Sequence, residues 1–457
     1  MASVKKLPDN LTELEKVGMR PLLQTSRWFA LALVGLAGVV VWWMYAYSVQ
    51  LRGGLAVTGM RDVVMWGLYI VNFVFFIGIS HAGTLISAIL RVTGAGWRTP
   101  ITRMAEVITV VALMIGALMP ITDLGHPERA LNLVIFGRYQ SPILWDFLSI
   151  TTYLTGSLIY LYLPMIPDMA MLRDKLPLTA PAWRRQLYTM LAAGWRGTPT
   201  QKRRLERAIS IMAVLIIPIA VSVHTVVSWI FSMTVRPGWN STIFGPYFVV
   251  GAIFSGIASI LIAMVIFRRI YRLEAYITKK HFVYLGYLML ALGVIYMYFT
   301  AAEYLTVAYK LADNDRQLLT LLFTGSQAPW FWAFGVGGTL VPVLIVAYPR
   351  TRTIPGILVA AILVNIGMWL KRFVIVVPSL QVPLMPFDFG RYQPTWVEWS
   401  VTAGAFAGFI LIFALFSKVF PIISVWEVAE QEEKAARTAS RLVPAPGPAA
   451  PREGSDV

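Results

Sequence analysis

Long apolar runs separated by short polar connections make up most of the chain. A helix needs about 20 apolar residues to cross the hydrocarbon layer of a membrane, and ten runs approach or exceed that length. They lie at residues 28–49, 63–93, 101–122, 143–165, 209–234, 243–267, 282–311, 329–347, 355–378 and 400–421. The pattern predicts an all-α integral membrane protein with ten transmembrane helices.

Polar segments flank these runs at both ends of the chain. Residues 1–27 precede the first run and are charged, so we expect an N-terminal tail and not a cleaved signal. Residues 427–457 are charged and then rich in Pro and Ala, which predicts a disordered C-terminal tail.

Composition and charge agree with a membrane protein. Only 14% of the residues are charged, compared with about 25% in soluble domains, and the mean hydropathy is +0.66. The net charge of +16 comes from basic residues before residue 28 and in the connections around 91–103, 166–208, 268–280 and 350–352. With ten spans these connections share one side, so the positive-inside rule predicts that both termini are cytoplasmic. The basic excess then indicates topology and contact with anionic lipid, not nucleic-acid binding.

Cysteine and histidine limit the cofactors that the chain can hold. The sequence has no cysteine, which excludes thiolate-bound iron–sulfur clusters, thioether-linked haem and disulfides. Of its four histidines, only His81 and His224 lie in suitable runs for a bis-histidine haem. Counting ~1.5 Å per residue places them ~27 Å and ~14 Å below the outer ends of their helices. We therefore expect no haem and no metal in this chain.

Two segments share a pattern at a constant offset, which indicates an internal repeat. WGLYIVNFVFFIG from Trp66 and FGPYFVVGAIFSG from Phe244 align with an offset of 178, and SPILWDF from Ser141 pairs with APWFWAF from Ala328. The repeat predicts two parallel four-helix bundles at 63–234 and 235–378, flanked by a first helix at 28–62 and an outer loop and last helix at 379–426. Chance recurrence of Gly and aromatic residues is the alternative.

One difference between the copies directs attention to the first bundle. Asp146 of the first copy corresponds to Ala333 of the second. Asp146 lies in the segment MPITDLGHPERALNLVIFGRYQSPILWDFLS, which also holds Asp123. Ionisable groups inside membrane helices are costly and commonly functional, and a carboxyl group there can exchange a proton with a ligand hydroxyl.

Four consecutive helices are expected to bring polar groups to one depth near the outer surface. Those groups are Tyr69, Asn72, Asp123, Asp146 and His224. Structural alternatives stay open: Asp146 could cap its helix, and Asp123 could cap the turn at residues 125–127 or pair with Arg129 or Arg138. His224 could be an interhelical hydrogen-bonding group, and Trp66 an interfacial anchor.

Other buried charges suggest a proton path. His81, Arg103 and Glu106 lie toward the cytoplasmic side, where Arg103 and Glu106 could instead form an i,i+3 ion pair. In the second bundle, Glu303 could face Lys371 and Arg372 as an ion pair or as part of the path. Asn365 and Tyr298 could extend it.

Several motifs together resemble the NrfD/polysulfide-reductase family of membrane subunits, and within it the ten-helix quinol-binding subunits of bacterial alternative complex III. The resemblance runs from about Arg20 to Trp426. The motifs are WGLYIVNFVFFIGISHAGTLISAILR, PITRMAE, DLGHPERALNL, SPILWD, SVHTVVSW, GWNSTIFGPYFVVGAIFSG and LKRFVIVVP.

The resemblance implies a haem-free subunit in a bacterial inner membrane that oxidises menaquinol at the periplasmic side. Electrons would pass to a periplasmic, molybdopterin-oxidoreductase-like iron–sulfur subunit and then to multihaem cytochrome c subunits, beside a second related ten-helix membrane subunit. Proton translocation could accompany turnover. The rival interpretations are a structural or proton-conducting subunit of such a complex, and a secondary transporter.

The resemblance also implies roles for individual residues. The family's quinol-site positions fall on Asp146 and Asp123, with His224 as a further catalytic candidate. Tyr69, Asn72, Trp66, Arg138 and Tyr139 are the quinol-binding candidates. Many alternative complex III members carry His where this chain has Asp123 and Asp where it has Ile230.

Overall fold

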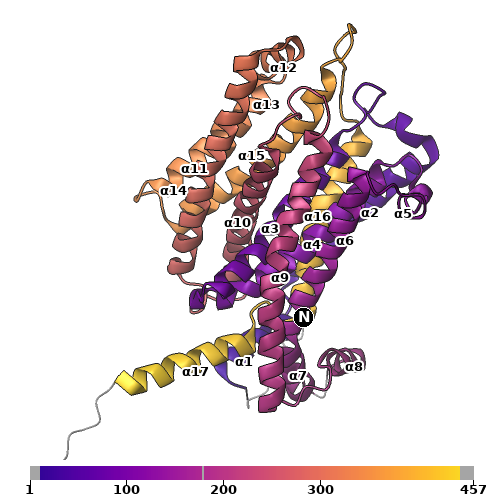
Figure 1. Ribbon diagram of the computed structural model, residues 1–457. Helices are drawn as coiled ribbons and strands as arrows, with labels where there is room; N and C mark the ends of the chain where they lie inside the picture. The colour runs from indigo at the N-terminus through magenta and orange to yellow at the C-terminus, as the bar shows by residue number, and fades with distance from the viewer. Residues whose placement is uncertain (1–10, 178–179, 443–457) are drawn as a thin grey trace, which may run out of the picture.

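The computed structural model describes residues 11–177 and 180–442, which form helices and short connections with no β-strand in these two ranges (Figure 1). All ten predicted apolar runs fall on helices. These are α2 (Arg27–Gly53), α3 (Leu68–Val92), α4 (Thr99–Asp123), α6 (Pro142–Tyr162), α9 (Pro199–Ser232), α10 (Phe244–Ile270), α11 (Lys279–Lys310), α13 (Ala328–Trp332) continuing into α14 (Val341–Ala347), α15 (Ile354–Gln381) and α16 (Trp396–Val419). The shorter helices are α1 (Glu13–Leu23), α5 (Asn132–Ile135), α7 (Ile166–Lys175), α8 (Ala182–Leu191), α12 (Asp313–Phe323) and α17 (Val425–Leu442).

Nine helical segments of the described chain are long and apolar enough to cross a membrane, so this is a multi-pass integral membrane protein. The tenth predicted span, α6, is not among those nine. It is 21 residues long, or about 31 Å at 1.5 Å per residue, and it packs along α4 and α9. Asp146 and several hydroxyl residues interrupt its apolar sequence.

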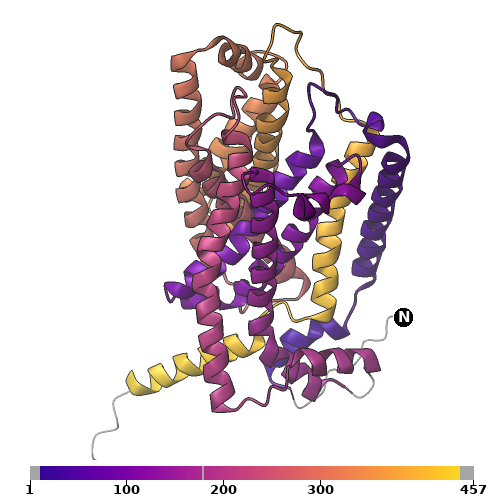
Figure 2. The ribbon, with the colours of Figure 1, turned by 45° about the vertical axis from the view of Figure 1, so that its right-hand side comes forward.

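We call α3, α4, α6 and α9 the first group of long helices and α10, α11, α13–α14 and α15 the second group. Each helix packs on at least one other member of its group, but α10 also packs extensively on α3 and on α9, so packing alone does not separate the two groups. Helix α2 lies outside both and pairs with α16 at the edge of the molecule (Figure 2). The common origin of the two groups and the domain boundaries stay predictions.

Glycines allow the backbones of neighbouring helices to approach closely at two places. A Cβ atom at Gly83 of α3 would lie 1.9 Å from the carbonyl oxygen of Ala105 in α4, so these helices touch through a glycine. Gly338 and Gly367 do the same between α15 and the π-helical turn Ala333–Leu340 that joins α13 to α14.

The two ends of the bundle differ in structure. One end carries α1, α7, α8 and α17, and we call it the terminal end (Figure 1). The other carries α5, α12 and the 382–395 connection, and we call it the loop end.

The prediction of a disordered tail after residue 426 is wrong for the described part, because residues up to Leu442 form helix α17. The first turn of α17 is held by Asp168 of α7, whose carboxylate accepts hydrogen bonds from the backbone N–H groups of Val425 and Trp426. The N-terminal tail likewise contains an ordered helix, α1, with a capping box between Thr12 and Glu15. Residues 1–10 and 443–457 lie outside the described ranges.

Candidate functional site

Asp146 lies one turn into α6 at the loop end. Its side chain is buried, and its Oδ1 atom has no hydrogen-bond partner among the described residues. The N-cap of α6 is Ser141, and no side-chain cap hydrogen bond is formed there, so the structure gives no support to a capping role for Asp146. A buried carboxyl group without a partner is costly, which makes this position a candidate for contact with a ligand hydroxyl.

Asp123 is the last residue of α4 and also keeps a buried Oδ1 atom without a partner in the described chain. The ion pairs weighed with Arg129 and Arg138 are not formed there, because both arginines are exposed on the connection beyond α4. Asp123 instead lies within electrostatic range of Tyr69 in α3 and Glu398 in α16.

Tyr69 is linked to the end of α4 through a short hydrogen-bonded chain. Its hydroxyl donates to Gln50 Oε1 at 2.6 Å, and Gln50 Nε2 donates to the carbonyl oxygen of Thr122, the neighbour of Asp123, at 2.7 Å. Gln50 is buried in α2, which carries few other buried residues. The sequence interpretation missed it, since a single glutamine near the end of an apolar run carries little signal.

Glu398 of α16 is a further buried carboxylate at the loop end, and the sequence interpretation missed it. It accepts hydrogen bonds from the backbone N–H groups of Gly59 at 2.6 Å and Thr395 at 3.0 Å and from the Tyr392 hydroxyl at 2.5 Å. Burial and the neighbouring Glu398 carboxylate raise the pKa of Tyr392, so its hydroxyl stays protonated and donates. Glu398 is thus fully engaged in holding the loop end together, in contrast to Asp123 and Asp146.

The remaining predicted quinol contacts separate into buried and exposed residues. Asn72 donates to Thr402 and accepts from Trp369 Nε1, both at 2.9 Å, so it links α3, α15 and α16. The Trp66 ring stacks on Trp239 with centroids 5.8 Å apart. The side chains of Arg138 and Tyr139 are exposed in the connection before α6.

His224 lies deeper than predicted. Its ring centroid is 4.1 Å from that of His81, which in turn is 4.9 Å from the Tyr153 ring of α6. His81 follows Tyr69 by 12 residues on α3, about 18 Å of helix, so His224 does not share the depth of Tyr69. The described contacts include no hydrogen bond, ring contact or electrostatic interaction between Asp146 and Asp123, Tyr69 or His224.

The prediction that His81 and His224 lie at different depths, which argued against a haem between them, is therefore wrong. Helices α3 and α9 are staggered, so residues counted from their ends to different depths still meet side by side. The two imidazoles contact each other directly, whereas histidines that ligate a haem lie on opposite faces of the macrocycle.

The two histidines differ in their hydrogen bonding. The His81 nitrogens lie 2.7 Å and 2.6 Å from the carbonyl oxygens of Ile77 and Ala220, and a neutral ring can donate to only one of them at a time. Neither ring nitrogen of His224 has a hydrogen-bond partner in the described chain, although the ring is fully buried. This pair of rings could receive and release a proton in the middle of the first group of helices.

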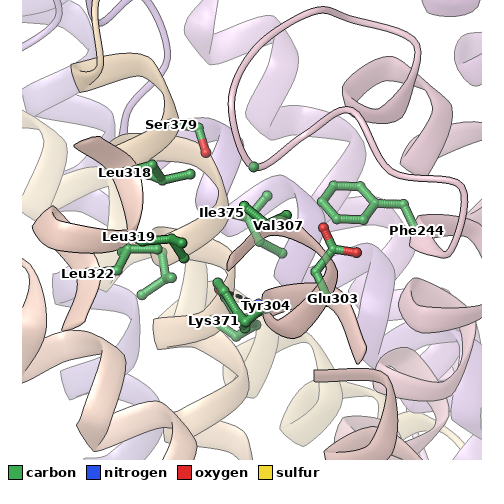
Figure 3. Close-up of a pocket in the computed structure, with 12 residues that line it drawn as sticks. Phe244, Glu303, Tyr304, Val307, Leu318, Leu319, Leu322, Lys371, Ile375 and Ser379 are labelled. Atoms are coloured by element: carbon green, nitrogen blue, oxygen red, sulfur yellow. Dashed lines mark hydrogen bonds between the residues drawn. The ribbon is translucent and has the colours of Figure 1, made fainter. Parts of the chain in front are cut away.

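In the second group, Glu303 and Lys371 line one small cavity of about 20 Å3, room for about one water molecule (Figure 3). Lys371 Nζ donates to the Tyr304 hydroxyl at 3.1 Å and lies over the rings of Tyr304 and Phe334. Glu303 accepts from Ser241 Oγ at 2.5 Å. Glu303 also borders a larger cavity of about 500 Å3 at the loop end.

Arg372 lies between the two groups. Its guanidinium is 5.6 Å from the ring centroid of Phe248 and within electrostatic range of His224. Asn365 accepts from Ser259 Oγ at 3.1 Å. Tyr298 does not extend the predicted proton path, because its side chain is 67% exposed.

At the terminal end, the ion pair considered between Arg103 and Glu106 is not formed. Arg103 Nη1 donates to Asp168 at 2.5 Å, and Nη2 donates to the carbonyl oxygen of Pro164 at 2.9 Å. Glu106 accepts from Ser87 at 3.0 Å and keeps Oε2 buried without a partner among the described residues. The sequence interpretation missed Asp168, because this residue lies in a charged connection that resembles solvated chain.

Comparison with known proteins places the chain in a family. The model of the polysulphide reductase NrfD family matches residues 56–383, which is most of the chain. The chain belongs to the NrfD family.

Relatives of this NrfD-family chain are named as subunits of reductases and oxidoreductases. It is 27% identical over 423 residues to a putative dimethyl sulfoxide reductase membrane subunit of Halobacterium salinarum, covering 86% of this chain and 92% of the relative. It is 24% identical over 425 residues to a selenate reductase subunit of Mesobacillus selenatarsenatis, covering 88% and 95%. It is 25% identical over 431 residues to the Hdr-like menaquinol oxidoreductase integral membrane subunit of Archaeoglobus fulgidus, covering 89% and 97%.

Proposed function

We propose that this chain is the membrane subunit of a quinol oxidoreductase complex and that it binds and oxidises menaquinol at the loop end of α3, α4, α6 and α9. Family membership supports the general role, and the Archaeoglobus fulgidus relative, which is similar over nearly its whole length, is named as a menaquinol oxidoreductase subunit. Resemblance to alternative complex III subunits supports the more specific assignment.

The unpartnered, buried carboxyl group of Asp146 is the observation that carries the proposal. Oxidation of menaquinol releases two electrons and two protons, so its hydroxyl groups need nearby proton acceptors. Asp146 accepts one hydroxyl proton. Asp123, which lies near Tyr69, accepts the second. No direct interaction joins the two carboxyl groups in the described chain. The quinol head group therefore either lies between them or contacts them one after the other.

Electrons leave through partner subunits because the chain has no cysteine with which to bind an iron–sulfur cluster or a covalently attached haem. The partners are a periplasmic, molybdopterin-oxidoreductase-like iron–sulfur subunit and multihaem cytochrome c subunits, beside a second related membrane subunit. The loop end then faces the periplasm of a bacterial inner membrane, and both termini are cytoplasmic, in agreement with the basic connections of the terminal end.

A proton path through the second group is part of the proposal. Glu303 borders both the cavity at the loop end and the small cavity of Lys371, so it can exchange protons between them. Arg372, His224 and His81 continue the row of buried polar groups into the first group, and Glu106 lies nearer the terminal end.

The test is menaquinol oxidation by the purified complex that carries Asp146→Asn, compared with the native complex at equal assembly. The variant removes the proton acceptor but keeps the size of the side chain, so we expect turnover to fall at least about 100-fold while the metal centres of the partners stay intact. Thr152→Ala, six residues further along α6, serves as the control, because Thr152 is exposed and its hydroxyl donates to the carbonyl oxygen of Leu148 and not to Asp146. This variant should turn over at the native rate. Unchanged turnover in Asp146→Asn would refute the assignment.

A further inference from the structure

A cavity of about 850 Å3 opens at the terminal end, far from the carboxyl groups of the loop end. It lies where the α1–α2 connection meets the ends of α10 and α16. Its volume is in the range of a pocket for a small molecule or part of a lipid.

Three basic side chains border this cavity, namely Arg20, Arg272 and Lys418. Lys418 Nζ donates to the carbonyl oxygens of Pro21 and Gln24, each at 2.9 Å, and lies over the Phe29 ring at 4.4 Å. None of the three forms an ion pair within the described residues, and no carboxylate is among the residues that border the cavity. The cavity therefore carries uncompensated positive charge.

The other wall of the cavity is apolar and exposed on the surface of the helix bundle. Trp28 of α2 is 81% exposed and Ile270 of α10 is 50% exposed, and Phe29 and Ala32 continue the surface along α2. These residues begin or end helices that are long and apolar enough to span the membrane. A site with cations at the membrane boundary and an apolar wall along a span matches an amphiphile with an anionic head group.

We propose that this cavity binds one anionic phospholipid, with its phosphate between Arg20, Arg272 and Lys418 and an acyl chain along Trp28, Phe29 and Ala32. Helix α2 contacts the rest of the bundle chiefly through α16, so a lipid here fills the space between α2 and α10 and fixes α2 in place. Zwitterionic phospholipid fits the apolar wall equally well, but its choline or ethanolamine group is repelled by the three cations. The site thus selects for net negative charge.

The experiment measures which phospholipids stay bound to the purified complex, by native mass spectrometry after exchange into detergent with equal amounts of phosphatidylglycerol and phosphatidylcholine. We expect retained phosphatidylglycerol to exceed phosphatidylcholine on this subunit. In the double variant Arg20→Gln with Arg272→Gln, retention of phosphatidylglycerol should fall about tenfold or more, since each cation near a lipid head group contributes about 1 kcal/mol.

Arg269→Gln is the matched control, because Arg269 is an exposed arginine at the same end of α10 that does not border the cavity. It should retain phosphatidylglycerol as the native chain does. A further arm adds inorganic phosphate. Displacement of phosphatidylglycerol by millimolar phosphate would identify an anion site and overturn the lipid assignment, as would equal retention of the two lipids by the native complex.

Discussion

Buried polar side chains in this protein fall into two kinds, and the difference lies in their partners. Arg103, Asn72 and Glu398 have most of their polar atoms paired with neighbouring helices or loops. Asp123 and Asp146 each leave an oxygen buried and unpaired within the described chain. Because native proteins pair most buried polar groups, these two oxygens at the loop end are candidates for contact with a ligand. Glu106 and His224 also keep unpaired atoms in the described chain, and they belong to the proposed proton path.

The two touching histidines give a prediction at this scale. His81→Leu removes the hydrogen bond that the neutral ring donates to one of two buried carbonyl oxygens, and it should lower the free energy of unfolding by about 1–3 kcal/mol. His224→Leu removes no hydrogen bond that the described chain shows, so it should leave the thermal midpoint of the complex close to native. Thermal unfolding of the two purified variants decides this, and equal losses in both would contradict the described bonding.

His224→Leu should also slow turnover if the ring relays protons. Turnover with menaquinol is then reduced in a variant whose fold is intact, which separates a proton relay from a structural role. Native turnover in His224→Leu would remove this ring from the proton path.

The residue types at the site could be predicted from the sequence, but their grouping could not. Asp146 stands out because an acid in an apolar run is rare, and the difference from Ala333 marks it further. The separation of His224 from Tyr69 depends on the stagger of α3 against α9, which residue counting does not give. Gln50 and Glu398 reach the surroundings of Tyr69 only through packing of α2 and α16 on the first group.

At the scale of elements, the start of helix α17 is held by the buried ion pair of Arg103 with Asp168 and by the ion pair of Arg91 with Glu427. Arg103 and Asp168 are each 1% exposed, and Asp168 also accepts from the first backbone N–H groups of α17. Removing one partner of a buried pair leaves the other charge uncompensated and costs about 3–5 kcal/mol.

Asp168→Ala should therefore lower the thermal midpoint and expose the start of α17 to protease. Asp174→Ala is the control in the same helix, because Asp174 is 61% exposed and pairs with Arg173 at the surface, where an ion pair contributes little. Limited proteolysis followed by mass spectrometry measures both. Protection of the α17 start in Asp168→Ala would show that the pair does not hold this helix.

The nine spans of the described chain could be predicted, because an apolar run of about 20 residues satisfies its backbone inside lipid by forming a helix. The short amphipathic helices were missed, since charged tail segments resemble solvated chain. Helix α17 becomes ordered through Asp168, more than 250 residues earlier in the sequence. No local pattern in the tail reports that contact.

At the scale of the whole molecule, the absence of cysteine from the sequence allows a direct test of topology. Gln140→Cys places one thiol on the exposed connection of the loop end, and Arg185→Cys places one on α8 at the terminal end. A membrane-impermeant maleimide should label Gln140→Cys in cells with an opened outer membrane. It should label Arg185→Cys only after the inner membrane is permeabilised. The reverse pattern would place the loop end in the cytoplasm and move the proposed quinol site with it.

The two helix groups differ at the position that distinguishes the candidate quinol site. Asp146 lies on a regular helix, whereas Ala333, its counterpart in the predicted repeat, begins the π-helical turn that packs through Gly338 on α15. The second group instead carries Glu303 and Lys371 around a small cavity. We propose that quinol is oxidised at the loop end of the first group, and that the proton path begins at Glu303 and Lys371 of the second group and continues through Arg372 to His224 and His81 of the first.

Photolabelling can locate the bound quinone directly. A menaquinone analogue with a photoreactive group on its ring, cross-linked in the native complex and mapped by peptide mass spectrometry, should label the segment from the end of α4 through the first turns of α6. Labelling should fall in Asp146→Asn and persist in Thr152→Ala. Labels confined to the helices of the second group or to a partner subunit would contradict the assignment of the quinol site to this end of the first group.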